Sequence, residues 1–92
     1  MKLVNAVSKI AELPKILTQH GIPMEDVLGV QYNKNAIGNT DILVQLHLKE
    51  SIEKLGNCEI ENFIANDDTN WTYYNTINGG ISFVYCEREA IA

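Results

Sequence analysis

The pattern that most constrains the fold is a pair of alternating apolar segments, residues 71–77 and 81–86, separated by Asn78-Gly79-Gly80. Aromatic and β-branched residues on both sides of a turn rich in Asn and Gly predict an antiparallel β-hairpin. A three-residue loop places the large residues of both strands on one face, whereas a two-residue loop places them on opposite faces. We favour the three-residue loop, with Ile77 opposite Ile81. The large side chains that this register gathers on one face are Trp71, Tyr73, Ile77, Ile81, Phe83 and Tyr85.

The N-terminal part of the chain predicts two helices. Apolar residues recur at spacings of three and four from Leu3 to Leu17, which is typical of one apolar helix face. Pro14 interrupts this pattern, so we expect a helix over residues 2–12 and a second, short helix with Pro14 in its first turn. His20-Gly21 follows as a C-terminal stop, where His20 acts as a cap rather than as a ligand.

The middle of the chain predicts strands joined by short helical turns. Strands are expected near residues 28–34 and 41–48, with a helical turn at 49–55 and a further strand at 57–65. The polar segment 33–40 is expected to be a loop. Together with the hairpin, these elements predict one small α+β domain over residues 1–92. Its N-terminal helical segment should pack on a mostly antiparallel sheet of four or five strands.

In these registers the second face of the sheet is unusually apolar. The inward face should contain Val30, Ile42, Val44, Leu46, Leu48, Ile60 and Ile64 as well as the large hairpin residues. The opposite face then receives Leu43, Phe63, Tyr74 and Val84, which is more apolar surface than an exposed sheet face usually keeps. Three interpretations stay open: the tail with Ala90 and Ile91 covers it, the register differs, or a protein partner or homodimer binds there.

The acidic residues are concentrated in the second half of the chain. The formal net charge is −5, and from Lys49 onward there are 3 cations and 8 acids. Such a surface repels phosphate, so direct binding of nucleic acid is not expected. The charge can serve solubility alone, or it can mimic nucleic acid and occupy a basic groove of another protein.

The sequence contains no recognisable catalytic or metal-binding motif. Cys58 and Cys86 are too few for a disulfide framework, stand apart from His20 and His47, and are expected to stay unbonded. We therefore expect no cofactor, no metal and no enzymatic activity. No run of ~18 apolar residues is present and the first residues lack the features of a signal peptide, so we expect a cytoplasmic protein without a membrane segment.

Three sequence segments also carry a resemblance. Leu13-Pro14-Lys15-Ile16-Leu17, His20-Gly21-Ile22-Pro23 and Asn78-Gly79-Gly80-Ile81-Ser82-Phe83, in a small acidic chain, resemble small accessory proteins of phages and prophages of Gram-positive bacteria. This resemblance implies a cytoplasmic, non-enzymatic protein that acts on a host or phage protein. The sequence therefore predicts a protein-binding module, and an acidic inhibitor of a nucleic-acid-binding protein is the alternative.

Overall fold

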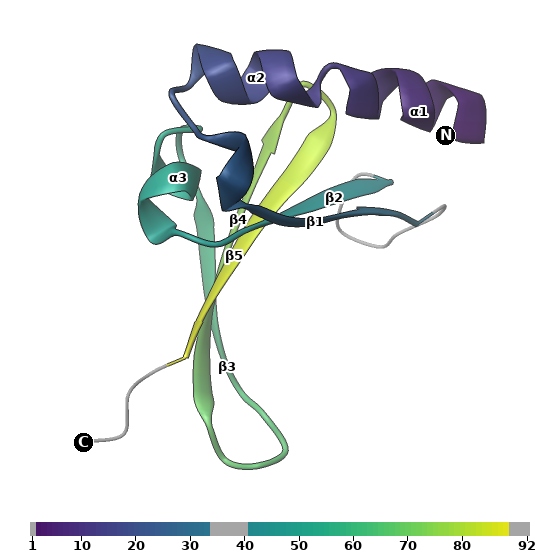
Figure 1. Ribbon diagram of the computed structural model, residues 1–92. Helices are drawn as coiled ribbons and strands as arrows, with labels where there is room; N and C mark the ends of the chain where they lie inside the picture. Colours follow the sequence, from purple (N-terminus) through teal and green to yellow (C-terminus); the bar gives the residue numbers. More distant parts are fainter. Residues whose placement is uncertain (1, 34–40, 89–92) are drawn as a thin grey trace.

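A computed structural model describes residues 2–33 and 41–88, and it confirms the α+β fold (Figure 1). Residues 34–40 of the predicted loop over 33–40, and the predicted cover by Ala90 and Ile91, lie outside the described residues. The elements are α1 (Leu3–Ala11), α2 (Leu13–Gln19), a 3-10 turn (Met24–Asp26), β1 (Val27–Tyr32), β2 (Ile42–Leu46), α3 (Lys49–Glu53), β3 (Glu59–Ile64), β4 (Asn70–Asn78) and β5 (Ile81–Arg88).

The two N-terminal helices form as their sequence predicts. Pro14 stands in the first turn of α2, where a missing amide proton costs no helical hydrogen bond. The helix ends at His20, and Gly21 follows in the left-handed conformation with φ of 70°. Only Ala6 of α1 is buried, so most of the predicted apolar face of this helix, including Leu3 and Val7, is exposed.

The five strands form one mixed sheet in the order β1-β2-β5-β4-β3. The pairs β1–β2, β3–β4 and β4–β5 are antiparallel, and β2–β5 is parallel. The parallel pair arises because the chain leaves β2 through α3, passes through β3 and β4, and returns to β2 with β5. The expectation of a mostly antiparallel sheet is thus confirmed, and β5 is its central strand.

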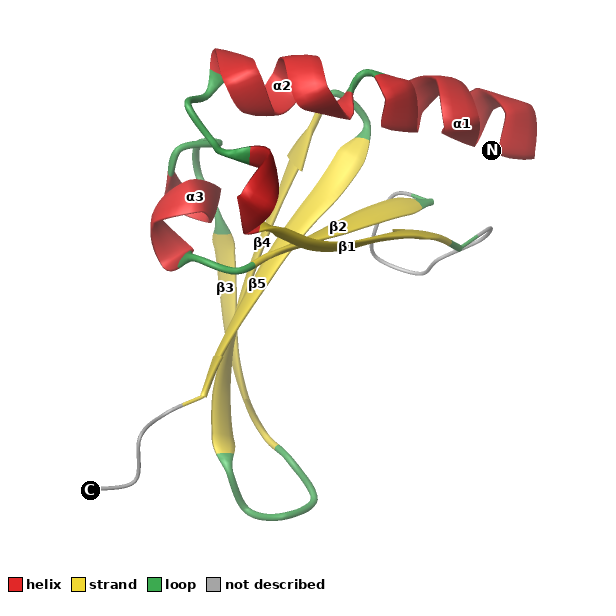
Figure 2. Ribbon diagram, viewed as in Figure 1, coloured by secondary structure: helices red, strands yellow, loops and turns green. Residues whose placement is uncertain are grey.

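The helices cover one face of the sheet at one end only (Figure 2). The core consists of apolar side chains from the helices and from the facing sides of β2, β4 and β5. Its fully buried members include Phe83, Leu17, Ile42, Leu46, Ile52, Ile81 and Val44. We call this covered side the core face and the other side the outer face.

The β4–β5 hairpin has a two-residue turn, so the predicted three-residue register is wrong. Asn78 pairs with Ile81, Ile77 pairs with Ser82, and only Gly79 and Gly80 form the turn. Both glycines have positive φ, 61° and 78°, as a type I′ turn requires, and this turn matches the twist of the flanking strands. Asn78 stays in the strand, where its side-chain nitrogen lies 3.3 Å from Nε2 of His20 at the end of α2.

The corrected register moves several residues that we expected in the core. Phe83 and Ile81 lie on the core face, whereas Trp71, Tyr73 and Ile77 lie on the outer face. Four other residues that we expect in the core are exposed, and one of them, Leu48, lies outside β2 and directly before α3. These residues are Val30, Leu48, Ile60 and Ile64.

Candidate functional site: an uncovered β-arm

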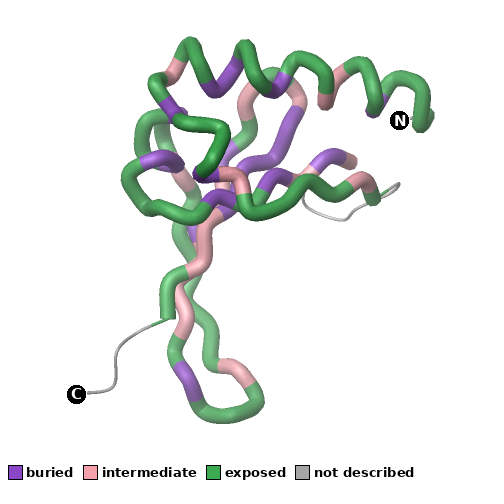
Figure 3. Tube along the Cα trace, in the orientation of Figure 1, coloured by how far each residue is buried: buried purple, intermediate pink, exposed green. Residues whose placement is uncertain are grey.

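The far half of the β3–β4 hairpin extends beyond the helices. We define the arm as residues 59–73, which comprise β3, the tip turn and the start of β4 (Figure 1). Every residue of β3 is exposed (Figure 3). The molecule is accordingly elongated, with principal extents of 44 × 30 × 21 Å.

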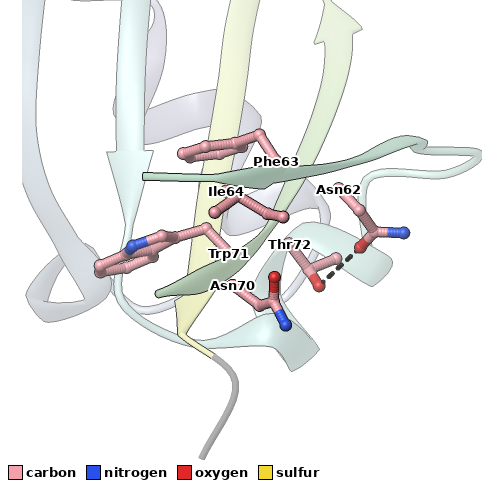
Figure 4. A pocket seen from close by; sticks show the side chains of 6 residues that line it. All are labelled: Asn62, Phe63, Ile64, Asn70, Trp71 and Thr72. Carbon is pink, nitrogen blue, oxygen red and sulfur yellow. Dashed lines mark hydrogen bonds between the residues drawn. The ribbon is translucent and has the colours of Figure 1, made fainter. Parts of the chain in front are cut away.

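The arm carries apolar side chains on both of its faces. Phe63 pairs directly with Trp71 on the outer face, while Ile60 and Ile64 project from the core face at 59% and 70% exposure. Figure 4 shows Phe63 and Trp71 on one side of the hairpin, with Asn62 and Thr72 on the other and joined by a 3.0 Å hydrogen bond.

A hollow of about 660 Å³ lies along this part of the arm. It is lined by Asn62, Phe63, Ile64, Asn70, Trp71 and Thr72. Because these side chains project from both faces of a two-stranded hairpin, they do not converge on an enclosed volume. The hollow therefore has the character of a docking surface rather than of a small-molecule site.

A relay of hydrogen bonds fixes the tip of the arm. The Trp71 indole N–H donates to Thr69 Oγ1 at 2.9 Å, and Thr69 Oγ1 donates to Asp67 Oδ1 at 2.5 Å. These bonds from Thr69 lower the pKa of the Asp67 carboxyl below its ordinary value. The Asp68 N–H donates to the Ala65 carbonyl, and Asp68 itself adopts the left-handed conformation with φ of 63°. The arm thus ends in a three-residue turn with a left-handed third residue.

β3 is an edge strand of the sheet, and among the described residues only β4 pairs with it. The Ala65 N–H donates to the Thr69 carbonyl, so Ala65 directs its main-chain groups toward β4. Because hydrogen-bonding direction alternates along a strand, Ile60, Asn62 and Ile64 direct theirs away from β4. The pairing of β3 with β4 runs without a register shift over 59–64. β1, at the opposite edge, is interrupted by a shift between Val27 and Gly29, which makes it a poorer template for another strand.

The four residues predicted to form a binding surface are separated in the structure. Leu43 and Val84 lie on the outer face of adjacent strands, and Val84 is buried there. Phe63 shares this face, but its partner Trp71 aligns with Arg88, about 13 Å along β5 from Val84. Tyr74 lies on the core face, because the two-residue turn reverses the face that we expected for it. Only Phe63 belongs to the arm.

Tyr74 belongs to a cluster that the sequence did not reveal. Its ring is 5.6 Å from that of Tyr85, and Lys49 Nζ lies 5.4 Å from its centroid. Its hydroxyl donates to Glu87 Oε2 at 3.4 Å, and its side-chain interaction with Lys49 raises the pKa of that ammonium. The cluster closes the core where the arm begins. The sequence would have indicated this cluster through the direct pairing of Tyr74 with Tyr85, but that pairing follows only from the two-residue turn.

The thiols and histidines do not assemble into a site. Both cysteines are free, and burial raises the pKa of Cys58 and of Cys86, which reduces the reactive thiolate. Cys58 Sγ contacts the Ile52 carbonyl oxygen at 3.6 Å. His20 contacts Asn78, while His47 is exposed after β2. Across residues 2–33 and 41–88, no group of three or more His, Cys, Asp or Glu side chains could hold a metal ion.

No helix in the described part of the chain is long and apolar enough to cross a membrane. Comparison with protein-family models, with curated proteins and with solved structures finds no match to this chain.

Proposed function

We propose that this chain is a cytoplasmic, non-enzymatic protein-binding module that contacts its partner through the arm. The observation that carries the proposal is the combination of apolar side chains on both faces of the arm with the position of β3 at the edge of the described sheet. Such a surface gains free energy when a partner removes it from water, at roughly 25 cal/mol for each Å² of apolar area. The resemblance to phage accessory proteins adds the expectation that the partner is a host or phage protein.

Photo-crosslinking tests this proposal. A photoreactive phenylalanine analogue replaces Phe63 in one variant and Met24 in another, since these side chains are 46% and 49% exposed. We expect an adduct of one defined mass from position 63 and none from position 24. Excess unmodified chain should suppress the adduct, whereas an Ile60→Ser/Ile64→Ser chain should suppress it much less. Equal labelling from both positions would contradict the proposal.

The second candidate function is an acidic mimic of nucleic acid. The arm contains Glu59, Glu61, Asp67 and Asp68 and no lysine or arginine, which supports this alternative. Added salt distinguishes the two functions, because apolar contact resists salt whereas a charge mimic weakens steeply with it. Asp67→Asn/Asp68→Asn should weaken binding only if the chain acts as a mimic.

A further inference from the structure

We propose that the partner seated on the edge of β3 that faces away from β4 is a second copy of this chain, which forms a two-fold symmetric dimer through antiparallel β3–β3 pairing. This inference rests on the proposed function, because it assigns an occupant to the same arm. The two sheets would join into one continuous sheet across the dimer axis.

The main-chain groups select the register. A two-fold axis perpendicular to the sheet keeps the core faces of both copies on the same side. Each edge offers the outward-directed groups of Ile60, Asn62 and Ile64. When Asn62 pairs with the partner's Asn62, Ile60 of each copy lies opposite Ile64 of the other. Only in this register does every outward-directed residue face another outward-directed residue. That register forms about six hydrogen bonds between the two β3 strands. If the centre of the pairing moves by one residue in either direction, about four such bonds form.

The side chains favour the same register. Centred on Asn62, the pairing puts Ile60 opposite Ile64 at both ends, so the exposed isoleucines cover one another. On the outer face it puts Glu61 opposite Phe63. A shift in one direction would place Glu61 against Glu61, and like charges directly opposite destabilise a pair. A shift in the other direction would pair Phe63 with the partner's Phe63, but it would place each Ile64 against Asn62 and leave each Ile60 beyond the partner strand.

The size of the contact sets the expected affinity. A single strand edge is small compared with the 1,200–2,000 Å² that stable interfaces typically bury. The antiparallel pairing also places the tip turn of each arm beside the start of β3 in the second copy, which enlarges the contact. We therefore expect a dimer with a dissociation constant in the micromolar range. Added salt should strengthen it, because each chain carries a net charge of −5.

Single-cysteine crosslinking tests the register. In a Cys58→Ser/Cys86→Ser background, Glu61→Cys, Asn62→Cys and Phe63→Cys are oxidised under identical mild conditions and separated without reductant. We expect Asn62→Cys to form the disulfide dimer at least about ten-fold faster than either neighbour, because only its Cα atoms face each other about 5.5 Å apart. Fastest dimerisation at position 61 or 63, or equal slow rates at all three, would overturn the inference. Gln31→Cys on β1 serves as a control at the other edge.

Light scattering of the unmodified chain tests the dimer itself. Asn62→Pro removes an outward N–H that β4 does not use, so the monomer should fold while the dissociation constant rises more than about ten-fold. Ile60→Ser should also weaken the dimer, whereas Val7→Ser should not, although these side chains are equally exposed at 59% and 58%. A chain that stays monomeric at about 500 µM overturns the dimer. The protein-binding function would survive that result if position 63 still crosslinks to a different protein.

Discussion

Replacing Gly79 with alanine tests how the β4–β5 turn supports the fold. Gly79 has φ of 61°, and a Cβ atom there would lie 3.1 Å from Ile16 Cδ1 of α2. The left-handed conformation costs a non-glycine residue about 1–2 kcal/mol, and overpacking against Ile16 adds about 1–2 kcal/mol. We therefore expect Gly79→Ala to lower the free energy of unfolding by about 2–4 kcal/mol. Urea denaturation, followed by Trp71 fluorescence and far-ultraviolet circular dichroism, measures this change.

The neighbouring glycine separates the two contributions. A Cβ atom at Gly80 would meet Lys9 Cε at 3.5 Å, an ordinary contact, so Gly80→Ala should cost only the conformational term of about 1–2 kcal/mol. Ile16→Val removes Cδ1 and should recover about 1 kcal/mol of the Gly79→Ala loss in a double-mutant cycle. A three-residue loop would instead leave Gly79 at negative φ, and alanine would stabilise the fold by about 0.4–1 kcal/mol. An increase in stability would therefore refute the two-residue turn.

Three further predictions follow from the core and the tip. Phe83→Ala should lower the free energy of unfolding by about 3–5 kcal/mol in urea denaturation, and Ile77→Ala should lower it much less, because of the two only Phe83 is fully buried. Equal losses would contradict the placement of Phe83 on the core face and of Ile77 on the outer face. Asp68→Gly should raise the unfolding free energy by about 0.5–1 kcal/mol with an unchanged m-value, since glycine relieves the positive φ; a lower midpoint would count against this. The lowered pKa of Asp67 means that its stabilising contribution is present above the ordinary value of 3.8 and is lost as the pH falls through the lower folded value. Trp71 emission should report this loss only below pH 3.8, and Asp67→Asn should abolish the step.

Local patterns predicted the elements well because their determinants lie close together in sequence. The break at Pro14 and the stop at His20-Gly21 are fixed by backbone chemistry within one or two residues. The alternation of Ile42, Val44 and Leu46 likewise predicted a strand with one buried face, which the structure confirms.

The hairpin register could not be decided from the turn sequence alone. Asn78-Gly79-Gly80 is compatible with both a two-residue and a three-residue turn, and the choice between them reverses one strand relative to the other. Contacts distant in sequence accompany the observed choice. Asn78 meets His20, and Gly79 provides space for Ile16, so α2 packs closely on the turn. Neither contact can be inferred from the turn sequence, because His20 and Ile16 are about 60 residues away from it in the chain.

The sequence also does not show which part of the sheet is covered by other elements. This coverage determines where the candidate site lies. Alternation shows which residues share a face, but it does not show whether anything covers that face. Ile60 and Ile64 follow the same alternation as Ile42 and Val44, yet the first pair is exposed and the second is buried. In the described part of the chain, α1, α2 and α3 lie at one end of the sheet (Figure 2), and most of the apolar face of α1 is itself exposed. The apolar residues of β3 are therefore exposed because of where the described helices pack, which the alternation along β3 does not reveal.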